Sequence, residues 1–446
     1  MEKKRSRVVI VPCDSYDEEK VYHAMRTGIE LLGGIGEFVS PQEKILVKPN
    51  FLSAAAPEKA VTTHPAVIKA MLRILSEAGC ENVKYGDSPG HGSCAGAAQK
   101  IGLTPENTFG AVLADMSEEV CTPFPEGMTA QEFYFAKEVT EADAIISLSK
   151  MKTHALERVT GAVKNVYGLI CGYRKAAGHV KYPNASIFAR MLADIHRCVK
   201  PRLHIMDGIV AMEGNGPGSG DPVPMNVLLF SKDPVALDSV FCTMVCLDPE
   251  LVPTNTQGEA MEIGTYHRSR IELITPAAET GMNTADEKEN GAAEAGKSTA
   301  DEKESGAAET GMSTADEKES GAAEAGMNTA DEKQSGESVS FRRLNGAALR
   351  EEFGNRQFKV ERRGTKRTAF VRYSDFMTSL ARRPRIDKKL CIRCGVCVEH
   401  CPVPGKAVNF KNGRKEPPVY DYKKCIRCYC CQEMCPRHAI TAGRRR

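Results

Sequence analysis

The 446-residue sequence lacks any apolar run approaching the ~20 residues that a membrane-spanning helix needs. Its opening residues, MEKKRSR, are polar and basic, and no apolar stretch typical of a secretory leader follows them. Its 17 cysteines would suggest disulfides in a small secreted protein, but nine of them crowd into residues 391–435 and the rest are scattered singly. We therefore expect a protein without a membrane span, in the reducing cytoplasm.

Nucleotide-binding motifs are also missing. No G-x-G-x-x-G opens the first strand–helix unit, and the glycine-rich stretch EGNGPGSG, which begins at Glu213, lacks the GK[ST] ending of a P-loop. No flavin motif is evident either. These absences argue against nicotinamide and nucleoside-triphosphate chemistry.

One cysteine pattern occurs twice near the end of the sequence. The pattern C-x2-C-x2-C-x3-C-P begins at Cys391 and again at Cys425. In such runs three cysteines bind one iron–sulfur cubane, and the fourth, followed by proline, binds the other. We therefore predict two [4Fe–4S] clusters, each bound by three cysteines of one run and the last cysteine of the other run. The predicted ligands are Cys391, Cys394, Cys397 and Cys435 for cluster 1, and Cys425, Cys428, Cys431 and Cys401 for cluster 2.

Zinc is the alternative cofactor at these cysteines. Its four-ligand sites usually take two C-x2-C pairs far apart in sequence, which two four-cysteine runs do not match. Cys430 breaks the spacing that Cys428 and Cys431 keep, so we expect it to be a small residue beside the cluster and not a ligand. The stretch 385–446 resembles a bacterial-type two-cluster ferredoxin domain, which implies a small α+β fold.

Strands and helices alternate over residues 1–275. Apolar runs at residues 8–12 and 44–51 predict buried strands, and the amphipathic stretch from Glu18 to Leu32 predicts a helix. A second helix is predicted in THPAVIKAMLRILSEAG, with Thr63 as its cap. Further strands are expected to begin near Asn82, Ala142, Arg202, Asn226 and Ile271. This order predicts an α/β fold with a doubly wound, mostly parallel sheet.

The composition changes at residue 276. A 15-residue unit repeats as far as residue 338 and contains no aromatic or branched aliphatic side chain. Such a segment cannot bury enough apolar surface to offset the entropy of ordering, so we expect a disordered linker or loop insertion. A row of amphipathic helices is the alternative, but the unit has no apolar face. Residues 339–384 form a connector in which VSFRRL and FKVERR predict short strands that return to the first sheet.

The net charge of +2 hides strong segregation along the chain. Residues 341–446 carry 27 Lys/Arg against 9 Asp/Glu, whereas residues 277–340 carry 5 against 16. Part of the basic charge offsets the negative charge of the cubanes. The arginines at 382–385 and 444–446 suggest docking of an acidic redox partner protein. Nucleic-acid binding is less favoured, because few aromatic residues are interleaved with these arginines.

Polar clusters follow the predicted strands, where ligands bind in open parallel sheets. Lysines there, with the N–H groups of the glycine-rich loop, suggest an anionic small-molecule substrate. Each residue alone is more simply a solvated lysine, a turn glycine or a cap, but their common location favours a site. We predict that His154, Lys150 and Lys152 are catalytic, with His64 as another candidate proton carrier. The predicted substrate-binding residues are Lys48, Asn50, Asp87, Asn165, Asp207, Glu213, Gly214 and Gly216. Lys164, beside Asn165, is expected to face the same crevice.

Six segments in order, among them LVKPNF, YGDSPG, SKMKTHALERVTGAVKNVYGL and SKDPVALDSV, resemble the domain-of-unknown-function 362 family over about residues 7–275. The resemblance implies an α/β domain, often followed by a ferredoxin module, and no settled reaction. We predict a redox enzyme whose clusters pass electrons between an external donor and an anionic substrate. The alternative is a non-enzymatic electron carrier or assembly factor whose α/β domain docks a partner protein.

Overall fold

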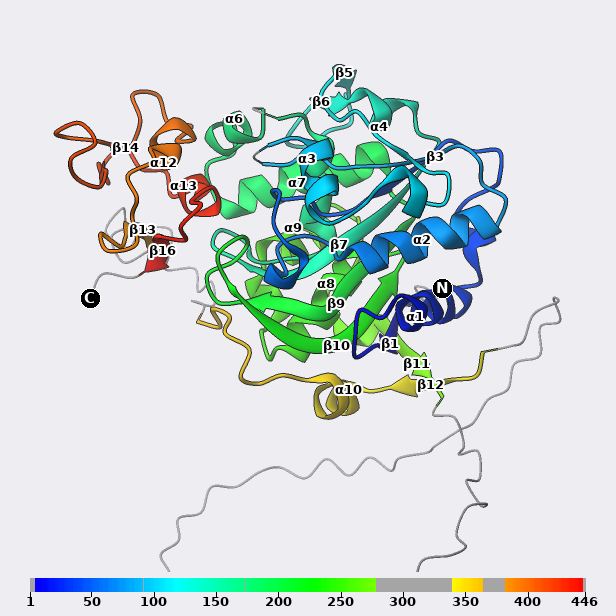
Figure 1. Cartoon of the computed structure of the whole chain (residues 1–446). Helices are drawn as coiled ribbons and strands as arrows, with labels where there is room; N and C mark the ends of the chain where they lie inside the picture. Colours follow the sequence, from blue (N-terminus) through cyan, green and yellow to red (C-terminus); the bar gives the residue numbers. More distant parts are fainter. Residues whose placement is uncertain (1–4, 91, 173, 278–338, 364–381, 444–446) are drawn as a thin grey trace, which may run out of the picture. The chain divides into compact units, whose positions relative to one another are not determined.

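The computed structural model describes residues 5–90, 92–172, 174–277, 339–363 and 382–443 (Figure 1). Met1–Pro276 and Phe341–Arg446 belong to one compact unit. The repeat tract predicted at 276–338 lies almost wholly outside the described residues, as do the three arginines at 444–446. Within the described part of the chain, no helix is both long enough and apolar enough to cross a membrane.

A large sheet forms the centre of this unit. Its strands are β1 (Ser6–Pro12), β2 (Ile45–Lys48), β3 (Val83–Tyr85), β4 (Val112–Leu113), β7 (Ala144–His154), β8 (Arg158–Thr160), β9 (Leu203–Glu213), β10 (Asp221–Ser231), β11 (Ile271–Pro276) and β12 (Phe341–Leu344). In the described residues these ten strands follow the order β12-β11-β1-β10-β9-β7-β2-β3-β4, and β8 pairs with β7. The run from β9 to β4 is parallel, whereas β10 is antiparallel to both of its neighbours. The predicted α/β fold is confirmed, with β10 as an antiparallel insertion.

Helices cover both faces of the sheet. The main ones are α1 (Glu18–Glu30), α2 (Pro65–Glu77), α3 (Cys94–Lys100), α5 (Ala162–Asn165), α6 (Arg174–Lys181), α7 (Ala185–Val199), α8 (Pro234–Met244), α9 (Pro253–Ala260) and α10 (Gly346–Phe353). Gly28 of α1 lies against the ring of Phe230 in β10, where a Cβ would clash. The next side chain along β10, Leu229, packs in the same apolar cluster as Phe241 of α8. Because neighbouring side chains of a strand point to opposite faces, α1 and α8 lie on opposite sides of the sheet.

Smaller elements complete the α/β part. They are the ribbon of β5 (Glu119–Pro123) and β6 (Glu132–Ala136) and the short helix α4 (Lys137–Glu141). The cap of helix α2 is His64 and not the predicted Thr63, because His64 Nδ1 accepts a hydrogen bond from Ala66 N. The Thr63 hydroxyl instead donates to Leu148 O of β7 and accepts from Asn50 N. Thr63 therefore ties the loop after β2 to the neighbouring strand.

The segment after the repeat tract returns to the sheet, as predicted. Strand β12 pairs antiparallel with β11, so that Phe341 lies opposite Pro276. The second predicted strand, FKVERR from Phe358, is wrong: residues 358–363 form no strand. Phe358 is instead fully buried against Phe241, and burial of its ring holds this stretch on the core.

The C-terminal module is built from two short ribbons and two single-turn helices. These are β13 (Arg383–Ile386) with β16 (Ile440–Gly443), β14 (Val408–Asn409) with β15 (Val419–Tyr420), and the helices α12 (Val396–Glu399) and α13 (Cys430–Glu433). The two cysteine runs adopt matching backbones. Arg393 and Arg427 have φ values of 59° and 60°, and the next matched pair, Gly395 and Tyr429, also has positive φ. Left-handed residues at these places turn successive backbone N–H groups inward, as in anion-binding loops.

Candidate functional site

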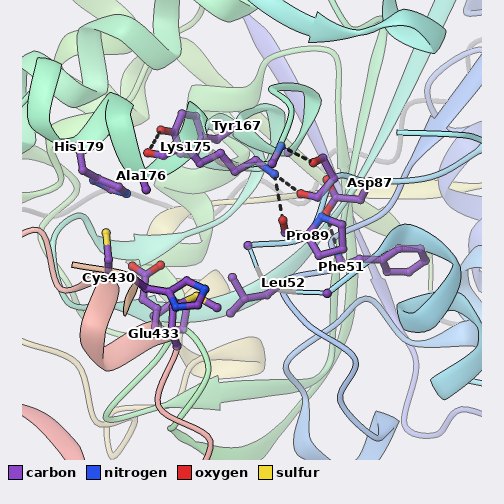
Figure 2. A pocket seen from close by; sticks show the side chains of 18 of the residues that line it. Phe51, Leu52, Asp87, Pro89, Tyr167, Lys175, Ala176, His179, Cys430 and Glu433 are labelled. Atoms are coloured by element: carbon purple, nitrogen blue, oxygen red, sulfur yellow. Dashed lines mark hydrogen bonds between the residues drawn. The ribbon is translucent and has the colours of Figure 1, made fainter. Parts of the chain in front are cut away.

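A cavity of about 520 Å³ lies where β2, β3 and β7 end. The loops after β2 and β3, together with α5 and α6, form its walls on the α/β side. Cys401, Cys430, Glu433 and Met434 of the C-terminal module form the opposite wall. Figure 2 shows Cys430 and Glu433 facing the same space as Lys175, Tyr167 and Asp87. The site at the carboxyl ends of the strands is therefore closed by the cysteine-rich module.

A buried ion pair sits at the base of the cavity. Lys48 Nζ lies 2.9 Å from Asp87 Oδ1, and Asp87 Oδ2 accepts a 2.6 Å hydrogen bond from Phe51 N. Burial lowers the pKa of the Lys48 ammonium, whereas the Asp87 carboxylate opposes that shift. Gly168 lies so close that a Cβ there would clash with Asp87 Oδ1. This pair is tightly packed and its charges neutralise each other.

A chain of amides links this pair to a second lysine. Asn165 Oδ1 accepts from Lys48 Nζ at 3.1 Å and from Asn50 Nδ2 at 3.3 Å. Asn50 Oδ1 in turn accepts from Lys152 Nζ at 2.7 Å, and Lys152 also donates to Val61 O at 2.8 Å. Burial, with the charge of Lys164 next in size, lowers the pKa of Lys152 well below its ordinary value. Of the predicted site residues, Lys48, Asn50, Asp87, Asn165 and Lys152 are thus brought together.

Three further lysines line the cavity: Lys164 and Lys175 on the α/β side, and Lys406, which donates to Glu399 O and Cys401 O, on the side of the C-terminal module. Within the described part of the chain, neither Lys164 nor Lys175 forms a salt bridge, although Lys164 lies 5.9 Å from the centre of the Tyr167 ring. Lys175 Nζ donates to the backbone oxygens of Ser88 and Pro89 (Figure 2). Burial lowers the pKa of Lys175 to about 8. Together with Lys152, these side chains give the cavity an excess of positive charge.

His179 is a cavity residue that the sequence analysis missed. Its ring stacks on Phe188, with centroids 4.5 Å apart, and meets the edge of Tyr167. Burial lowers the pKa of His179 to about 4, so the imidazole is neutral at pH 7. Tyr167 donates its hydroxyl to Lys175 O at 2.7 Å. Lys175 and His179 stand four residues apart on α6 and therefore share one helix face, a spacing that the sequence displays.

His154 does not line this cavity. Its Nδ1 accepts from Leu156 N and Glu157 N at 3.1 Å each, so the proton of the neutral ring resides on Nε2. That Nε2 lies 3.0 Å from Glu433 Oε1. Burial lowers the pKa of His154 to about 4; for Glu433 burial alone would raise the pKa, but His154 and Lys164 bring it down to about 2. His154 therefore positions the Glu433 carboxylate.

Lys150 and Asp207 belong to a separate buried network. Lys150 Nζ lies 2.8 Å from Asp207 Oδ2 and 2.7 Å from the Tyr16 hydroxyl, which donates to Asp207 Oδ1 at 2.8 Å. His64 stacks on the Tyr16 ring, and its backbone N–H donates to Asp207 Oδ2. None of these residues lines the cavity. Their partners are already satisfied, so the network links β7 to β9 and offers no open position for a substrate.

The glycine-rich loop after β9 holds the C-terminal module. Gln432 Nε2 donates to Asn215 O at 2.8 Å, to Asn215 Oδ1 and to Gly216 O, while Asn215 Nδ2 donates to Ile440 O. His438 Nδ1 lies 2.7 Å from Ser219 Oγ. The loop predicted to bind an anionic substrate is thus occupied by the chain itself.

The other two residues predicted in that loop have internal partners as well. Glu213 Oε2 accepts from Lys359 N at 2.7 Å, and Gly214 N donates to Lys359 O at 2.8 Å. Glu213 and Gly214 therefore anchor the return segment that carries Phe358, and Gly216 N is bound to the Thr153 hydroxyl. We conclude that Glu213, Gly214 and Gly216 organise the interface and not the cavity.

The predicted ligands of cluster 1 come together around one void. Cys391, Cys394, Cys397 and Cys435 all line it, although Cys435 comes from the second run. Cys435 Sγ accepts a hydrogen bond from Ala439 N at 3.3 Å. No three His, Cys, Asp or Glu side chains in the described ranges converge closely enough to hold a single metal ion.

The second set of cysteines is related to the first by the repeat. Burial raises the pKa of the Cys425 thiol, and the nearby Cys428 and Cys401 raise it further. Cys401 Sγ accepts from Ala407 N at 3.3 Å, matching the Cys435 contact, and Cys431 Sγ accepts from the Tyr420 hydroxyl at 3.1 Å. Such hydrogen bonds stabilise thiolate charge and tune cluster potentials. The donor set fits a second cubane.

Known proteins identify the α/β part. A family model described as "Domain of unknown function (DUF362)" matches residues 45–243. The thylakoid-associated protein sll1697 of Synechocystis sp. is 35% identical over 261 residues, which are 57% of this chain and 79% of that protein. The chain belongs to the DUF362 family. The matched range of the DUF362 domain contains Lys48, Asn50, Asp87, Lys152, Lys164, Asn165, Lys175 and His179.

A second model, a 4Fe-4S dicluster domain, matches residues 383–436 and includes all eight predicted ligands. The C-terminal module is therefore an iron–sulfur domain of the 4Fe-4S type. Two solved structures resemble the DUF362 protein weakly. A Thermotoga maritima protein has a TM-score of 0.32 at 15% identity over 50% of this chain. The lactate racemase apoprotein from Thermoanaerobacterium thermosaccharolyticum has 0.34 at 13% over 55%. The chain spans 57% of each of these two proteins, and so slight a likeness carries no functional conclusion.

The Gln432 contacts generate a first prediction for this DUF362 protein. Gln432→Val, which introduces the residue found at the matching position 398 of the first run, removes three hydrogen bonds and leaves buried carbonyls unsatisfied. We expect a loss of about 1–3 kcal/mol in docking of the module. Faster amide hydrogen exchange at residues 214–220 with unchanged iron content reports it. Gln131→Val, an exposed glutamine, is the control; equal exchange in both variants contradicts the prediction.

Glu157 generates a prediction of pH dependence. This residue is fully buried between β7 and β8, neither carboxyl oxygen has a hydrogen-bond partner among the described residues, and burial raises its pKa to about 8. A raised carboxyl pKa favours the folded state at low pH, and that contribution declines as the pH rises from about 4.5 to about 8. Glu157→Gln removes the titration. We expect the variant to gain stability relative to the parent as the pH rises through this window.

Denaturant unfolding at pH 5, 6.5 and 8 measures the effect. The difference in unfolding free energy should grow by up to about 1.4 kcal/mol per pH unit, since one proton is involved. Glu30→Gln, at an exposed position on α1, is the matched control and should follow the parent at all three values. A constant difference between Glu157→Gln and the parent would mean that Glu157 is ionised in the folded protein.

Proposed function

We propose that the protein is an iron–sulfur oxidoreductase that exchanges electrons with an anionic small molecule bound in the 520 Å³ cavity. The observation that carries the proposal is the position of Cys401. This predicted ligand of cluster 2 lies on the wall of the same cavity as Lys152, Lys164 and Asn165. Electron transfer needs proximity between the cluster and the substrate, and one shared wall provides it.

Two [4Fe–4S] clusters are the proposed cofactors. Cys391, Cys394, Cys397 and Cys435 hold the first, and Cys425, Cys428, Cys431 and Cys401 hold the second. When bound, the clusters supply or accept single electrons. The chain's own residues bind the substrate, exclude water and handle protons.

Charge in the cavity supports an anionic substrate. Asp87 is neutralised by Lys48, whereas Glu433, bound by the neutral His154, keeps its negative charge on the cavity wall. Among the described residues, Lys152, Lys164 and Lys175 have no carboxylate within salt-bridge distance. A carboxylate or phosphate placed among them gains charge-assisted hydrogen bonds.

Proton transfer accompanies most reductions of small molecules, and two residues of α6 suit it. Lys175, with its pKa lowered to about 8 by burial, changes its protonation near neutral pH. The neutral His179 imidazole has one nitrogen able to accept a proton and one able to donate. These residues replace His154 and Lys150 as the proposed acid–base groups, because His154 and Lys150 lie outside the cavity.

The alternative, a docking surface for a partner protein, is less well supported. Lys48, Asp87 and Lys152 are at most 3% exposed, so they present almost no surface to a macromolecule. A small molecule reaches such residues, whereas a protein surface does not.

The cofactor assignment is tested by iron and acid-labile sulfide analysis of anaerobically prepared protein. We expect about eight irons per chain, from two cubanes of four. Cys401→Ser should lose about half, because it removes a ligand of cluster 2. Cys430→Ser is the matched control and should keep the full content, since Cys430 is not a ligand. Equal iron content in the two variants contradicts the assignment.

The reaction class is tested with dithionite-reduced protein and a panel of four anions. Pyruvate has a keto group that can take up two electrons and two protons to give lactate, whereas citrate, acetate and inorganic phosphate test anion binding alone. An accepted substrate should reoxidise the clusters, and Lys164→Met should weaken its binding about tenfold, the loss expected for one charge-assisted hydrogen bond. Lys164 is chosen because its removal breaks no ion pair. Lys100→Met, at an exposed position on α3, should bind like the parent. No reoxidation and no bound anion with the panel would count against the proposal.

A further inference from the structure

Two exposed apolar side chains flank Cys391. Leu390 and Ile392, on either side of this cysteine, are 47% and 55% exposed. Ile392 also lines the void that the predicted ligands of cluster 1 surround. Exposed apolar side chains that adjoin one another, unlike those scattered singly, are typical of interaction sites. This surface lies directly over the first set of cysteines.

The second cysteine run provides an internal comparison. The residues that match Leu390 and Ile392 are Lys424 and Ile426, and Ile426 is only half-exposed. The helix of the second run carries Gln432 and Glu433, which contact the DUF362 domain. The second set is therefore covered by the chain itself, whereas the first set is open to an external protein.

Cations surround the open surface. Lys388 and Lys389 precede Leu390, and the exposed Arg393 donates to Lys415 O at 2.9 Å, which places Lys415 beside it. Arg414 lies against Gly395 in the first cysteine run. Two carboxylates, Asp387 and Glu416, lie in the same stretches of sequence. With five Lys or Arg and two Asp or Glu, the rim has a formal net charge of +3.

We propose that this surface, the entry face (Lys388–Arg393 with Arg414 and Lys415), docks a small acidic one-electron carrier protein. The inference rests on the proposed redox function and adds its electron donor. The carrier loses one electron and the first cluster gains it, with no bond made or broken. An apolar centre of Leu390 and Ile392 excludes water in the complex, and the basic rim attracts and orients an acidic partner. Electrons then enter at the cluster that lies away from the substrate cavity.

Charge reversal at the entry face tests the proposal in the full-length holoprotein. Lys388→Glu with Lys389→Glu is compared with Lys423→Glu with Lys424→Glu, the same residue types just before the second run. The probe is a reduced acidic flavodoxin, and cluster reduction is followed by stopped-flow absorbance. At low ionic strength we expect the first pair to slow reduction at least about tenfold and the second pair to change it less than about twofold. High salt should remove most of the difference.

Dithionite separates the possible failures. This small reductant needs no docking face, so all variants should be reduced by it at the parental rate. If both charge reversals slow flavodoxin equally, or neither does, the entry face is wrong while the redox function stands. If dithionite fails to reduce the parent clusters, the redox function fails and the entry face fails with it. Leu390→Ser is a second variant that keeps the charge, and it should also slow flavodoxin while leaving dithionite unaffected.

Discussion

The contact between α13 and the loop after β9 is the interaction on which the rest of the structure depends. Gln432 fills the loop with three hydrogen bonds, and Glu433 reaches His154 at the end of β7. Because α13 lies within the second cysteine run, these contacts fix the distance between that run and the strand ends. The cavity, with Cys401 on one wall and Lys152 on another, exists only while the contact holds.

The buried lysines show how the fold tolerates charge at this place. Lys48 is neutralised by Asp87, and Lys150 by Asp207, so both pairs can be buried without a ligand. Lys152 has only neutral acceptors, the amide of Asn50 and the carbonyl of Val61. Burial of an ammonium with neutral partners is unfavourable. An anion bound beside Lys152 would therefore stabilise the charged form of this side chain.

Local rules predicted much of this arrangement. The cysteine spacing predicted which sulfurs gather, and Cys391, Cys394, Cys397 and Cys435 do line one void. The rule that ligands bind at the carboxyl ends of parallel strands predicted the location of Lys48, Asp87 and Asn165. Both rules depend on short-range geometry that the sequence displays directly. The iron content and the substrate role of these residues remain predictions.

Contacts between distant segments were beyond sequence reasoning. Lys150 and Lys152 are two residues apart on β7, yet the pairing with β9 is irregular between them and only Lys152 lines the cavity. The glycine-rich loop resembled an anion site because its partner, Gln432, lies 217 residues away in the chain. The only sequence signal for His179 was its position four residues after Lys175, which places the two on one face of a helix.

The antiparallel pairing of β11 with β12 has a consequence for the repeats between them. Phe341 lies opposite Pro276, and Ala277 N donates to Ser340 O at 2.9 Å, so both ends of the insertion are clasped at one edge of the sheet. The entropy of closing such a loop grows only with the logarithm of its length, by about 0.6 kcal/mol per doubling. Gain or loss of whole units is therefore nearly neutral for the rest of the molecule. The number of repeats can therefore change during evolution without altering the cavity or the cysteine runs.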